Sequence, residues 1–522
     1  MGDTNWGDAM NSTPAKSTRT ITRDVIVVGG GGSGLAAGIE AAGLHRSVAI
    51  LEKGQQLGGT TGRSVGSISS SNTPHQYRAG ILDSPQDHLD DLYRFNAKLG
   101  LPNHEVFSRL LVENVPDTMR WLMDMGITFF GPMNELPHRK PRMHNVLPNS
   151  RSFIFHMTRR ALRLGVSVHT STTARELIRE DGRVVGVLAD SPNGPVEFRA
   201  RGGVVLASGD YSADSAMKAQ FINDSVASFP AVNPTNTGDG HRMATAIGAR
   251  IVNGHLFHAG LRFPEPPPKW ITALPPHRPF TWAMNAALTH LPGWLLRPVL
   301  MAFLTTVLVP SPNLFREGGI LVNRRGERFA DELGDIDAPL GTQPDQQAYI
   351  LLDAHHIDKF SGWPWYVSTV PGFAYASIED YRRNRKDMVF EGSTLSELAA
   401  RIGVPAATLD QTVTDYNALS PNGGPPRGNR RGFGPGPFIA MGPVRTRINF
   451  IDGGLAVDDN LRVLGDDAQP IPGLYAAGLT GMGGVLLEGH GHHLGWVFTS
   501  GRFAGRRAAH AVVTDDLPQA RS

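Results

Sequence analysis

Short apolar runs alternate with glycine-rich turns at the start of the chain, and their order predicts a parallel β-sheet. Residues 24–28 (DVIVV) predict a buried strand that leads directly into the glycines of residues 29–34. The segment LAAGIEAAGLH then predicts a helix, and SVAILEK predicts a second strand that ends at Glu52. A strand, a turn, a helix and a second strand in this order are typical of a parallel sheet in an α/β protein.

Helical periodicity and a β-meander continue this unit through the first half of the chain. The patterns at 86–125 and 153–164 predict helices, and residues 166–212 predict a small meander that closes with GGVVLASGDYS. The loop NTGDGHRMATAIGA leads into another helix, for which Asp239 is well placed as the N-terminal cap. All these elements fit one α/β unit.

The pattern changes in the middle of the chain, where proline becomes frequent. Residues 260–345 predict irregular structure around the most apolar run, Val299 to Val309. A membrane-spanning helix needs about 20 apolar residues, so this run is too short to cross a bilayer. It predicts a buried helix, an oligomer contact or a surface that rests on lipid. A helix pair at 392–419, further strands and a last helix from Gly495 to Ala511 follow.

Composition narrows the chemistry that the chain can perform. Its 522 residues are too many for one core and predict two or three domains. The net charge of +2 indicates no basic surface for nucleic acid. Because the chain has no cysteine, it cannot form disulfides, thiolate metal sites, cysteine-ligated iron–sulfur clusters or a cysteinyl flavin link. This fits a cytoplasmic protein, and the polar first 20 residues predict a disordered leader.

Glycines at the first turn predict a dinucleotide-binding site. Gly29, Gly31 and Gly34 form the pattern G-x-G-x-x-G, which lets the backbone approach a pyrophosphate at the N-terminus of a helix. Glu52 follows 18 residues after Gly34, where its carboxylate can accept hydrogen bonds from ribose hydroxyls. NAD and FAD share this pattern, so the choice between them must come from other segments.

Three later segments favour FAD. Residues 58–64 (GGTTGRS) offer backbone N–H groups and hydroxyls to a longer cofactor. The strand that ends at Ser208 and Gly209 has small residues where a flat ligand would approach. The glycine-rich turn at 481–484 precedes a helix whose N-terminus would stabilise negative charge on a reduced flavin. Each segment taken alone is equally well explained as a capped loop.

Nearly the whole chain resembles one family of flavoproteins, which includes fumarate reductases, succinate dehydrogenase flavoprotein subunits and 3-ketosteroid dehydrogenases. The matching stretches occur in the family's order and include DVIVVGGGGSGLAAGIEAA, LEKGQQLGGTTGRS, NTGDGHRMATAIGA, GGILVNRRGERFADE and PIPGLYAAGL. The resemblance implies a Rossmann-like FAD-binding domain of the glutathione-reductase type with an inserted α+β capping domain. We therefore predict a leader at 1–20, an FAD-binding domain at 21–255 and 451–515, and a capping (substrate) domain at 256–450.

The resemblance also implies a set of FAD-binding residues. In membrane-bound members a histidine near the GGTT stretch joins the flavin covalently, but GGTTGRSVGSIS contains no histidine, so we predict non-covalent FAD. The residues predicted to bind FAD are Gly29, Gly31, Gly32, Ser33, Gly34, Glu52, Lys53, Gly58, Gly59, Thr60, Thr61, Ser64, Ala174, Gly209, Asp239, Gly478 and Gly495.

The family's substrate signatures are mostly missing from this chain. In fumarate reductases an arginine that donates the proton follows the GERF stretch, where this chain has Ile336. The C-terminal arginine that holds a dicarboxylate is not evident in LLEGHGHHLGW. The Tyr-Pro-Gly stretch of ketosteroid dehydrogenases is replaced by Leu487, Glu488 and Gly489. Neither a C4-dicarboxylate nor a 3-ketosteroid is therefore assigned as the substrate.

Histidines stand where these signatures are expected. His490, His492 and His493 lie with Glu488 close to the expected flavin face. They could supply a general acid or base, bind a substrate oxygen, or pack against neighbouring loops. The HxHH spacing also suits a metal, but no second ligand cluster is visible in the sequence, and we predict no metal site.

Further catalytic candidates lie in the predicted cap and at its ends. His258 is where the family often places a substrate-binding histidine. Arg445 and Arg447 could hold a carboxylate or polarise a carbonyl, although surface arginines are commoner. Tyr366 and Tyr375 could act as acid or base, although packing is the commoner role of such tyrosines. The predicted catalytic set is His258, Tyr366, Arg445, Arg447, His490, His492 and His493.

These observations predict an FAD-dependent dehydrogenase that introduces a C=C bond α,β to a carbonyl and passes electrons to an unidentified acceptor. The apolar segment at 282–309 favours a hydrophobic or ring-containing carbonyl compound, although it could equally form a dimer interface. The alternatives are an ene-reductase running the reverse reaction, an electron-transfer flavoprotein without its own substrate, and an NAD enzyme. The GGTT segment and the two-part FAD-binding domain disfavour the NAD enzyme.

Overall fold

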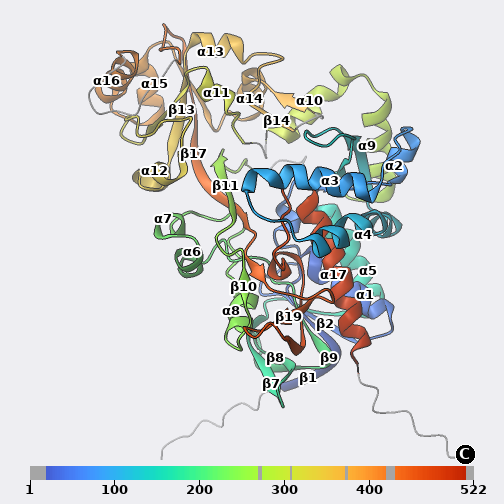
Figure 1. Cartoon of the computed structure of the whole chain (residues 1–522). Helices are drawn as coiled ribbons and strands as arrows, with labels where there is room; N and C mark the ends of the chain where they lie inside the picture. The colour runs from blue at the N-terminus through green and yellow to red at the C-terminus, as the bar shows by residue number, and fades with distance from the viewer. Residues whose placement is uncertain (1–18, 268–272, 306–308, 371–373, 419–429, 513–522) are drawn as a thin grey trace, which may run out of the picture.

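The computed structural model describes residues 19–267, 273–305, 309–370, 374–418 and 430–512, and its ribbon forms two lobes (Figure 1). The lower lobe is built on a mainly parallel sheet and the upper lobe on an antiparallel one. Two paired strands, β11 (Phe257–Arg262) and β17 (Phe438–Ile451), run between the lobes. These two strands enter the lower lobe next to the candidate functional site described below.

The parallel sheet is central to the lower lobe because its strands are apolar on both faces. β1 (Arg19–Val28) lies between β2 (Val48–Leu51) and β9 (Gly194–Leu206) and pairs with both in parallel. Val25, Ile26 and Val27 are fully buried, as expected for a strand covered on both sides. The strand order is β19 (Arg462–Leu464), β20 (Pro470–Ala476), β9, β1, β2 and β6 (Ser167–His169). The predicted α/β class is confirmed.

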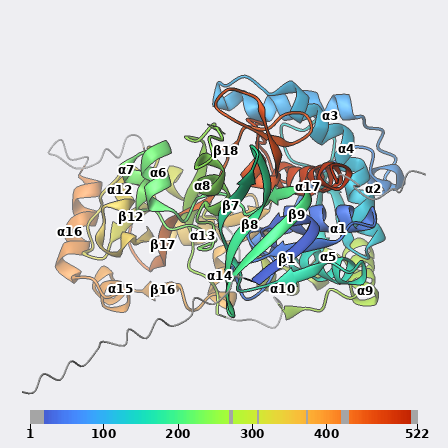
Figure 2. The ribbon, with the colours of Figure 1, turned by 90° about the horizontal axis from the view of Figure 1, so that it is seen from below.

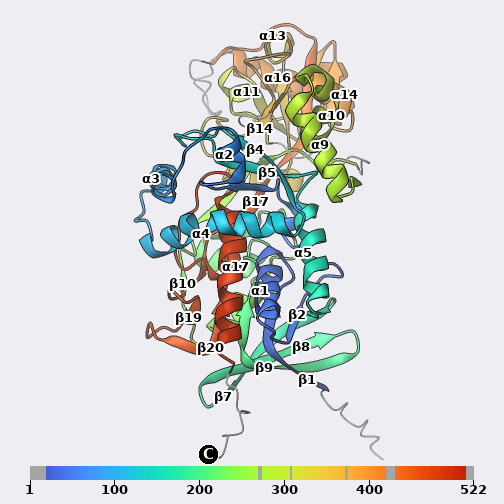
Figure 3. The same ribbon diagram turned by 90° about the vertical axis from the view of Figure 1, so that its right-hand side faces the viewer.

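Two helices lie side by side on one face of this sheet (Figures 1 and 3). They are α1 (Gly32–Gly43) and α17 (His492–His510). A Cβ at Gly505 of α17 would lie 2.2 Å from the carbonyl oxygen of Ala37 in α1, so only glycine allows this close approach. α5 (Arg151–Arg163) packs on the other side of α1. This packing fixes the N-terminus of α1 at the first glycine turn.

An antiparallel meander extends the sheet at its lower end, seen from below in Figure 2. It comprises β7 (Thr173–Glu180), β8 (Arg183–Ser191) and part of β9. The predicted meander also included the residues of β6, which instead pairs in parallel with β2. The free edge of β2 has unpaired backbone N–H and C=O groups. β6 can pair with this edge in parallel because the preceding helix, α5, carries the chain back along the sheet as a crossover.

The first strand begins earlier than predicted. Arg19 and Thr20, which the sequence analysis placed in a disordered leader, pair with Val196 and Glu197 of β9. The long β9 supplies ladder hydrogen bonds to a segment whose own pattern is too polar to predict a strand. The rest of the predicted leader, residues 1–18, lies outside the described residues.

A small three-stranded sheet and three helices cover the upper side of the lower lobe. The sheet has the order β3 (Ser67–Ser69), β5 (Met143–Leu147), β4 (Thr128–Met133). The helices are α2 (Pro74–Arg78), α3 (Pro85–Asn96) and α4 (Glu105–Asp124). The helical pattern predicted at 86–125 is thus two helices, because Ser84 caps α3 and His104 caps α4.

The upper lobe has its own sheet and its own apolar clusters. The sheet joins β11, β17, β13 (Ala348–Leu352) and β12 (Ile320–Asn323), with β16 (Val389–Gly392) also on β17. A short hairpin, β14 (Ser368–Val370) and β15 (Ala374–Ala376), adjoins it. Its helices are α11 (Asn313–Arg316), α12 (Asp337–Gly341), α13 (Ala354–Lys359), α14 (Ile378–Asn384), α15 (Leu395–Ile402) and α16 (Ala406–Asn417). The domain boundaries at 255/256 and 450/451 remain predictions.

Regular elements occupy much of the proline-rich segment 260–345 that was predicted to be irregular, and α9 and α10 are the longest helices in its described part. α9 (Arg278–His290) begins with Pro279 in its first turn, where proline favours helix initiation, and α10 (Gly293–Leu304) contains Pro298. Val299 is 47% exposed and Val309 44%, so the apolar run is not a buried helix. In the part of the chain that the structure describes, no helix is both long and apolar enough to cross a membrane.

Candidate functional site

The turn between β1 and α1 presents its backbone to a ligand. Gly29 has φ of +108°, and a Cβ there would lie 2.3 Å from the carbonyl oxygen of Ala207 in the loop after β9. A Cβ at Gly34 would lie 1.9 Å from the carbonyl oxygen of Gly29. Any larger residue would therefore push the strand and the helix apart. The glycines bring the N-terminus of α1 to the carboxyl ends of β1 and β9, where α/β folds bind ligands.

Glu52 is held at the end of β2 by backbone amides. Its two carboxylate oxygens accept hydrogen bonds from the N–H groups of Gly30, at 2.9 Å, and Gly54, at 2.7 Å. Each oxygen keeps a further lone pair, so the carboxylate can still accept a hydrogen bond from a ribose hydroxyl.

Lys53 links β2 to helix α8 (Asp239–Thr245) across the ligand-binding edge. Its ammonium donates hydrogen bonds to Asp239, at 2.7 Å, and to the hydroxyl of Thr237, at 2.5 Å. The prediction that Asp239 caps α8 is wrong. Gly238, in the left-handed region, is the cap residue, because the Asp239 carboxylate pairs with Lys53 and Arg242 instead.

These segments enclose a groove with about 720 Å³ of space between its walls, its open side included. Twelve of the predicted FAD-binding residues line it: Gly29, Gly31, Gly32, Ser33, Glu52, Lys53, Gly59, Thr60, Thr61, Ala174, Gly209 and Asp239. Sequence analysis did not assign to FAD several other residues that line it, namely Val28, Gly30, Leu51, Thr172, Ala207, Ser208, Thr235, Asn236, Leu479 and Val497. The groove is therefore made by segments from the whole lower lobe.

Asn236 belongs to a polar network that the sequence did not reveal. Its Nδ2 donates to the hydroxyl of Thr60, at 3.0 Å, and to Asp210, at 2.8 Å. Asp210 is fully buried, and burial raises its pKa although hydrogen bonds from Ser212 oppose this. Its second oxygen accepts from the backbone N–H of Ile451, at 3.2 Å. The network therefore joins the groove wall to the end of β17.

The remaining predicted FAD-binding residues do not line the groove. A Cβ at Gly478 in η5 (Gly478–Gly481) would lie 2.6 Å from the hydroxyl oxygen of Ser33. Gly495 faces α4, because a Cβ there would lie 3.2 Å from Leu111 and Val115. The predicted residues that do not line the groove are Gly34, Gly58, Ser64, Gly478 and Gly495. Their contact with FAD remains a prediction.

Asp452 joins two of the predicted histidines beside the groove. His258 of β11 places Nε2 3.0 Å from one oxygen of Asp452, and His493 of α17 places Nε2 2.9 Å from the other. The Asp452 side chain is 2% exposed, whereas those of His258 and His493 are 25% and 16% exposed. Phe450 packs against both imidazole rings. We refer to His258, Asp452 and His493 as the Asp452 cluster.

Charges in the Asp452 cluster stabilise one another. Burial disfavours the Asp452 carboxylate, but the charges and hydrogen bonds of His493 and His258 outweigh burial and hold its pKa well below its usual range. Burial also disfavours the His258 imidazolium, but the hydrogen bond and charge of Asp452 and the charge of Glu488 outweigh it and raise the pKa of His258. Because its pKa is raised, an imidazole of this kind keeps its proton to a higher pH than a free imidazole does, and it can release that proton to a reacting group.

The Asp452 cluster adjoins the groove on two sides. His493 and Val497 are one turn apart on α17 and so share a face, and Val497 lines the groove. Ile451, which precedes Asp452, is bound to Asp210 of the groove network. The cluster is therefore within the region where a substrate could meet a ligand in the groove.

His490 and His492 point to other partners. The Nδ1 of His490 pairs with Glu135, whose hydrogen bond raises the pKa of His490 against the effect of burial. His492 is fully buried, which lowers its pKa to about 4. Its Nδ1 donates to the carbonyl of Glu488, at 2.6 Å, and its Nε2 lies 3.1 Å from Nε2 of His88. Of the three predicted C-terminal histidines, only His493 joins His258.

The rings of His88, His138 and His492 form a second group, which we call the His492 cluster. Three of their nitrogens lie within 4.8 Å of one another, a spacing that could hold a metal. Arg142 opposes that use, because its guanidinium Nη1 lies 3.0 Å from Nδ1 of His138 and so places a cation beside one ligand. The absence of a metal remains a prediction.

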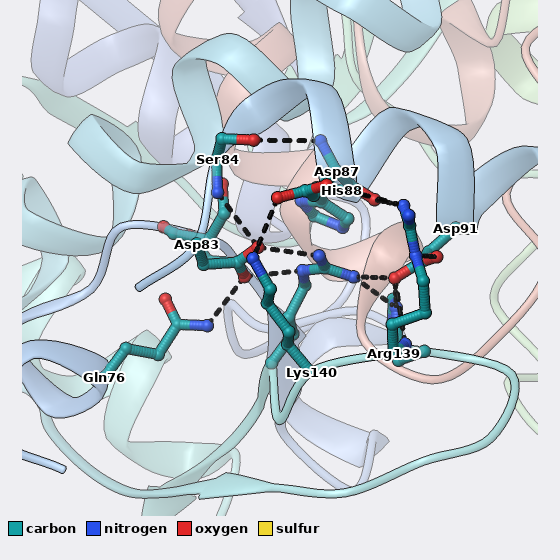
Figure 4. Close-up of polar contacts among 12 residues, drawn as sticks. Gln76, Asp83, Ser84, Asp87, His88, Asp91, Arg139 and Lys140 are labelled. Carbon is teal, nitrogen blue, oxygen red and sulfur yellow. Dashed lines mark hydrogen bonds and ion pairs between the residues drawn. The ribbon is translucent and has the colours of Figure 1, made fainter. Parts of the chain in front are cut away.

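A buried ion-pair network holds the loop that carries His138 of the His492 cluster (Figure 4). Arg142 is fully buried and binds Asp83 through Nε and Nη2, both at 2.7 Å, and Asp91 through Nη1, at 2.5 Å. Arg139 also binds Asp91, at 2.6 Å, and Lys140 binds Asp87, at 2.8 Å. These bonds fasten residues 134–142 to α3. The loop that carries Glu135 and His138 is thereby held against the N-terminus of α17.

Arg445 and Arg447 lie on the ribbon formed by β11 and β17. Arg445 is opposite Arg262 and Arg447 is opposite Gly260, so all three arginines share one face. Arg262 donates to Asn449, at 2.8 Å, and burial followed by the charge of Arg447 lowers the pKa of Arg262. Sequence analysis did not identify Arg262. Two neighbouring arginines suit a carboxylate or a polarised carbonyl oxygen.

The predicted tyrosines are not brought to the Asp452 cluster by any contact that the structure records. Tyr366 is half-buried just before β14. Tyr375 packs against Trp363 and beneath the guanidinium of Arg297, whose carbon lies 4.8 Å from the ring centroid. Their catalytic role remains a prediction.

Comparisons with known proteins agree with this geometry. The chain matches the family model described as FAD binding domain over residues 24–274 and 282–487. It is 27% identical to NADH:acrylate oxidoreductase of Vibrio harveyi over 95% of this chain, but it spans only 52% of that protein. It is 26% identical to urocanate reductase of Eggerthella lenta, covering 98% of this chain and 78% of that protein. It is also 26% identical to 4-oxocyclohexanecarboxylate 2-dehydrogenase of Sinomonas cyclohexanicum, covering 94% and 93%.

Solved structures show the same fold. A flavocytochrome c3 fumarate reductase in an open conformation superposes with a TM-score of 0.72 at 23% identity, covering 94% of this chain and 79% of that one. A 3-ketosteroid-Δ4-(5α)-dehydrogenase from Rhodococcus jostii superposes with a TM-score of 0.59 at 24% identity, covering 95% and 99%. The resemblance stated from the sequence is confirmed by these matches.

The groove fits FAD on its own chemistry. Glycines leave the backbone open where a pyrophosphate would lie at the N-terminus of α1, and Glu52 stands where a ribose would lie. The family match covers most of the chain. The chain therefore belongs to the FAD binding domain family and is an FAD-binding flavoprotein.

Proposed function

We propose that the protein is an FAD-dependent oxidoreductase that acts on a CH–CH bond next to a carbonyl or carboxyl group. The observation that carries this proposal is the Asp452 cluster, a half-buried acid–base group that adjoins the FAD groove. Three relatives whose names specify a reductase, an oxidoreductase and a dehydrogenase support the same class of reaction. We infer dehydrogenation of a cyclic carbonyl compound as the main direction and reduction of the corresponding double bond as the alternative.

Bound FAD would supply the two-electron acceptor or donor for this reaction. His493 or His258 takes a proton from the carbon next to the activating group, or returns it in the reverse direction. Asp452 orients both imidazoles through its two oxygens and stabilises the charged form of His258. Arg262 and Arg447, on the ribbon that ends at this cluster, are placed to bind an oxygen of the substrate.

The charged side chains near the groove indicate the substrate class better than the apolar segment at 282–309 does. The segment at 282–309, which suggested a hydrophobic substrate, lies largely on the outside of the molecule and does not line the groove. The arginines and histidines instead favour a substrate with an anionic or polarised oxygen. Acrylate, urocanate and 4-oxocyclohexanecarboxylate, which appear in the names of the relatives, each carry such an oxygen.

Several finer properties belong to the proposal. FAD is bound without a covalent link, because residues 58–70 contain no histidine. A separate electron donor or acceptor exchanges electrons with the flavin. Cytoplasmic location, a homo-oligomeric state and the absence of nucleic-acid binding remain predictions.

The first experiment releases the cofactor and then determines the direction of the reaction. Purified protein is denatured, and FAD in the supernatant establishes the non-covalent cofactor, whereas colour that stays with the precipitate indicates a covalent link. The loaded enzyme is then assayed anaerobically with 4-oxocyclohexanecarboxylate and an artificial oxidant, and with acrylate, urocanate and a cyclic enone and a reduced viologen. Turnover in either direction that is lost in both His258→Gln and His493→Gln supports the proposal. Full activity in both variants contradicts it.

A further inference from the structure

Helices α9 and α10 carry large apolar side chains on the outside of the molecule. Within α9 only Thr281 is buried, and its hydroxyl lies 2.8 Å from that of Thr128 in β4. Trp282 is 69% exposed and Trp294 is 74% exposed. Figure 3 shows α10 beside the upper lobe and α9 extending down beside β4 and β5. Exposed with the two tryptophans are Phe280, Leu291, Leu295 and Val299.

The second half of α10 is fixed to the upper lobe, whereas its first turn, which carries Trp294 and Leu295, is exposed. Met301 is 2% exposed within the apolar cluster of that lobe. Arg297 binds Asp380 of α14, at 2.6 Å, and covers the ring of Tyr375. Trp294 is therefore carried by a helix that is packed at its other end, and large exposed apolar side chains such as Trp294 and Trp282 mark a contact with a partner or a membrane.

The same part of the molecule lacks negative charge. The sequence has no Asp or Glu between Glu265 and Glu317, a stretch that includes α9 and α10. It has none between Glu135 and Glu176 either, a stretch that includes α5. The apolar surface is thus bordered by segments that carry only neutral or basic side chains.

A basic cavity of about 570 Å³ opens between the C-terminal part of α4, helix α5 and the start of α9. Arg159, Arg160 and Arg163 of α5 and Arg278 of α9 line it, and Asp124 is the one acidic residue among those that line it. Within the ranges that the structure describes, no ion pair and no guanidinium hydrogen bond occupies these four arginines. Unpaired guanidinium groups that converge on a cavity favour phosphate oxygens as ligands.

We propose that α9, α10 and the basic cavity form a docking surface for a membrane that contains anionic phospholipids. The tryptophans would enter the interfacial layer, where indole rings are favoured, and the arginines would bind lipid phosphates. Helices that are apolar on one side and lie beside basic residues rest on a bilayer without crossing it. The surface lies apart from the Asp452 cluster, so the inference does not depend on the proposed reaction.

Charge favours a bilayer over a second copy of the chain as the occupant. In a symmetric dimer the same patch of both copies meets, which would bring two sets of unpaired arginines together. The positive charges of the two sets of arginines would repel each other, whereas an anionic bilayer neutralises them.

Vesicle flotation with purified, FAD-loaded protein tests the docking surface. Vesicles of phosphatidylcholine that contain about 30% phosphatidylglycerol are compared with pure phosphatidylcholine vesicles at low and at high salt. The apolar variant combines Trp282→Ser and Trp294→Ser, and the basic variant combines Arg159→Gln, Arg163→Gln and Arg278→Gln. Val106→Ser, at a 52% exposed position of α4, and Arg179→Gln, at an exposed position of β7, are the matched controls. FAD content and thermal midpoint report folding.

Three results are expected. The native protein binds the anionic vesicles at least about tenfold more tightly than the neutral ones and is released by salt. The apolar variant binds both kinds of vesicle at least about tenfold more weakly, and the basic variant loses its preference for anionic lipid. Tryptophan emission shifts to shorter wavelength on binding in the native protein and both controls.

Three results would overturn the proposal. One is native protein that fails to float with anionic vesicles at low salt. Another is a basic variant that retains the lipid preference. The third is a dimeric mass by light scattering that becomes monomeric in the apolar variant while vesicle binding is unchanged, which would identify the surface as a subunit interface.

Discussion

His492 and His493 are neighbours in the first turn of α17, yet their surroundings make them chemically different. His492 is fully buried among His88, His138 and Phe95, and burial lowers its pKa to about 4. His493 is 16% exposed and bonded to Asp452, which also binds His258. His492 is therefore a buried, neutral imidazole, whereas His493 contacts a buried carboxylate in the group that we propose for acid–base catalysis. The difference shows that the partner, not the residue type or its place in a motif, determines the role of each histidine.

The largest expected effect comes from removing the charge that unites the Asp452 cluster. Asp452→Asn keeps the shape but no longer stabilises an imidazolium, so kcat/KM should fall by about 10³-fold while FAD content is retained. Steady-state kinetics and flavin absorbance measure the two effects. Asp466→Asn, at an exposed position 14 residues further along, should be neutral. If kcat/KM of Asp452→Asn equals that of the native protein, the cluster takes no part in the reaction.

The His492 cluster should respond to its anchor through stability. Arg142→Met leaves Asp83 and Asp91 buried and without their shared partner, so the free energy of unfolding should fall by about 3–5 kcal/mol. Urea denaturation measures it. Arg120→Met removes an exposed pair with Asp117 and an exposed hydrogen bond to the carbonyl of Asn72, and its cost should be about 0–1 kcal/mol. Equal effects in the two variants would mean that burial does not distinguish the two ion pairs.

Matched substitutions at the two neighbouring histidines should separate catalysis from stability. His493→Gln should lower kcat/KM by about 10²-fold with little change in the thermal midpoint. His492→Gln should lower the free energy of unfolding by about 1–3 kcal/mol, because buried polar partners are left unsatisfied, with activity per bound FAD retained. Both variants are assayed for kinetics and denaturation. If the two show the same pattern, the distinction between the clusters fails.

The last expected effects concern the pH dependence of stability, which has opposite signs for the two clusters. The pKa of His492 is lowered to about 4, so its contribution to stability is present above about 6.5 and is lost as pH falls from there towards 4. The pKa of His258 is raised, so its contribution is present below about 6.5 and is lost as pH rises through its raised pKa. Each group changes stability by at most about 1.4 kcal/mol per pH unit.

Denaturation curves from pH 4 to 9 for the native protein, His492→Gln and His258→Gln check these signs. His492→Gln should flatten the acid side of the curve, and His258→Gln the side above neutrality. Flattening on the opposite side in either variant would contradict the assignment.

The groove was largely predictable because its signals are local. Gly29, Gly34 and Glu52 act within one strand–turn–helix–strand unit, so their spacing alone places them together. The Asp452 cluster was not predictable in the same way. His258 and Asp452 are 194 residues apart in the sequence and meet only because β11 pairs with β17. No periodicity in the sequence reports that pairing.

Other differences between expectation and structure have equally specific causes. Proline in residues 260–345 suggested irregular structure, yet Pro279 occupies a position where it initiates α9. Asp239 suited a capping role, but Lys53 attracts its carboxylate across the groove. In each case a tertiary partner outweighed a local preference.

The pairing of Phe257 with Ile451 means that the chain leaves the lower lobe and returns to it at a single place. The segment between these residues is an insertion whose two ends are adjacent. An insertion of this kind can be lengthened, shortened or exchanged during evolution without altering the path of the chain around the groove. All residues that line the FAD groove lie outside this segment, so the groove can keep its form while the outer lobe diverges, provided that His258 at the base of the segment is retained for the proposed reaction.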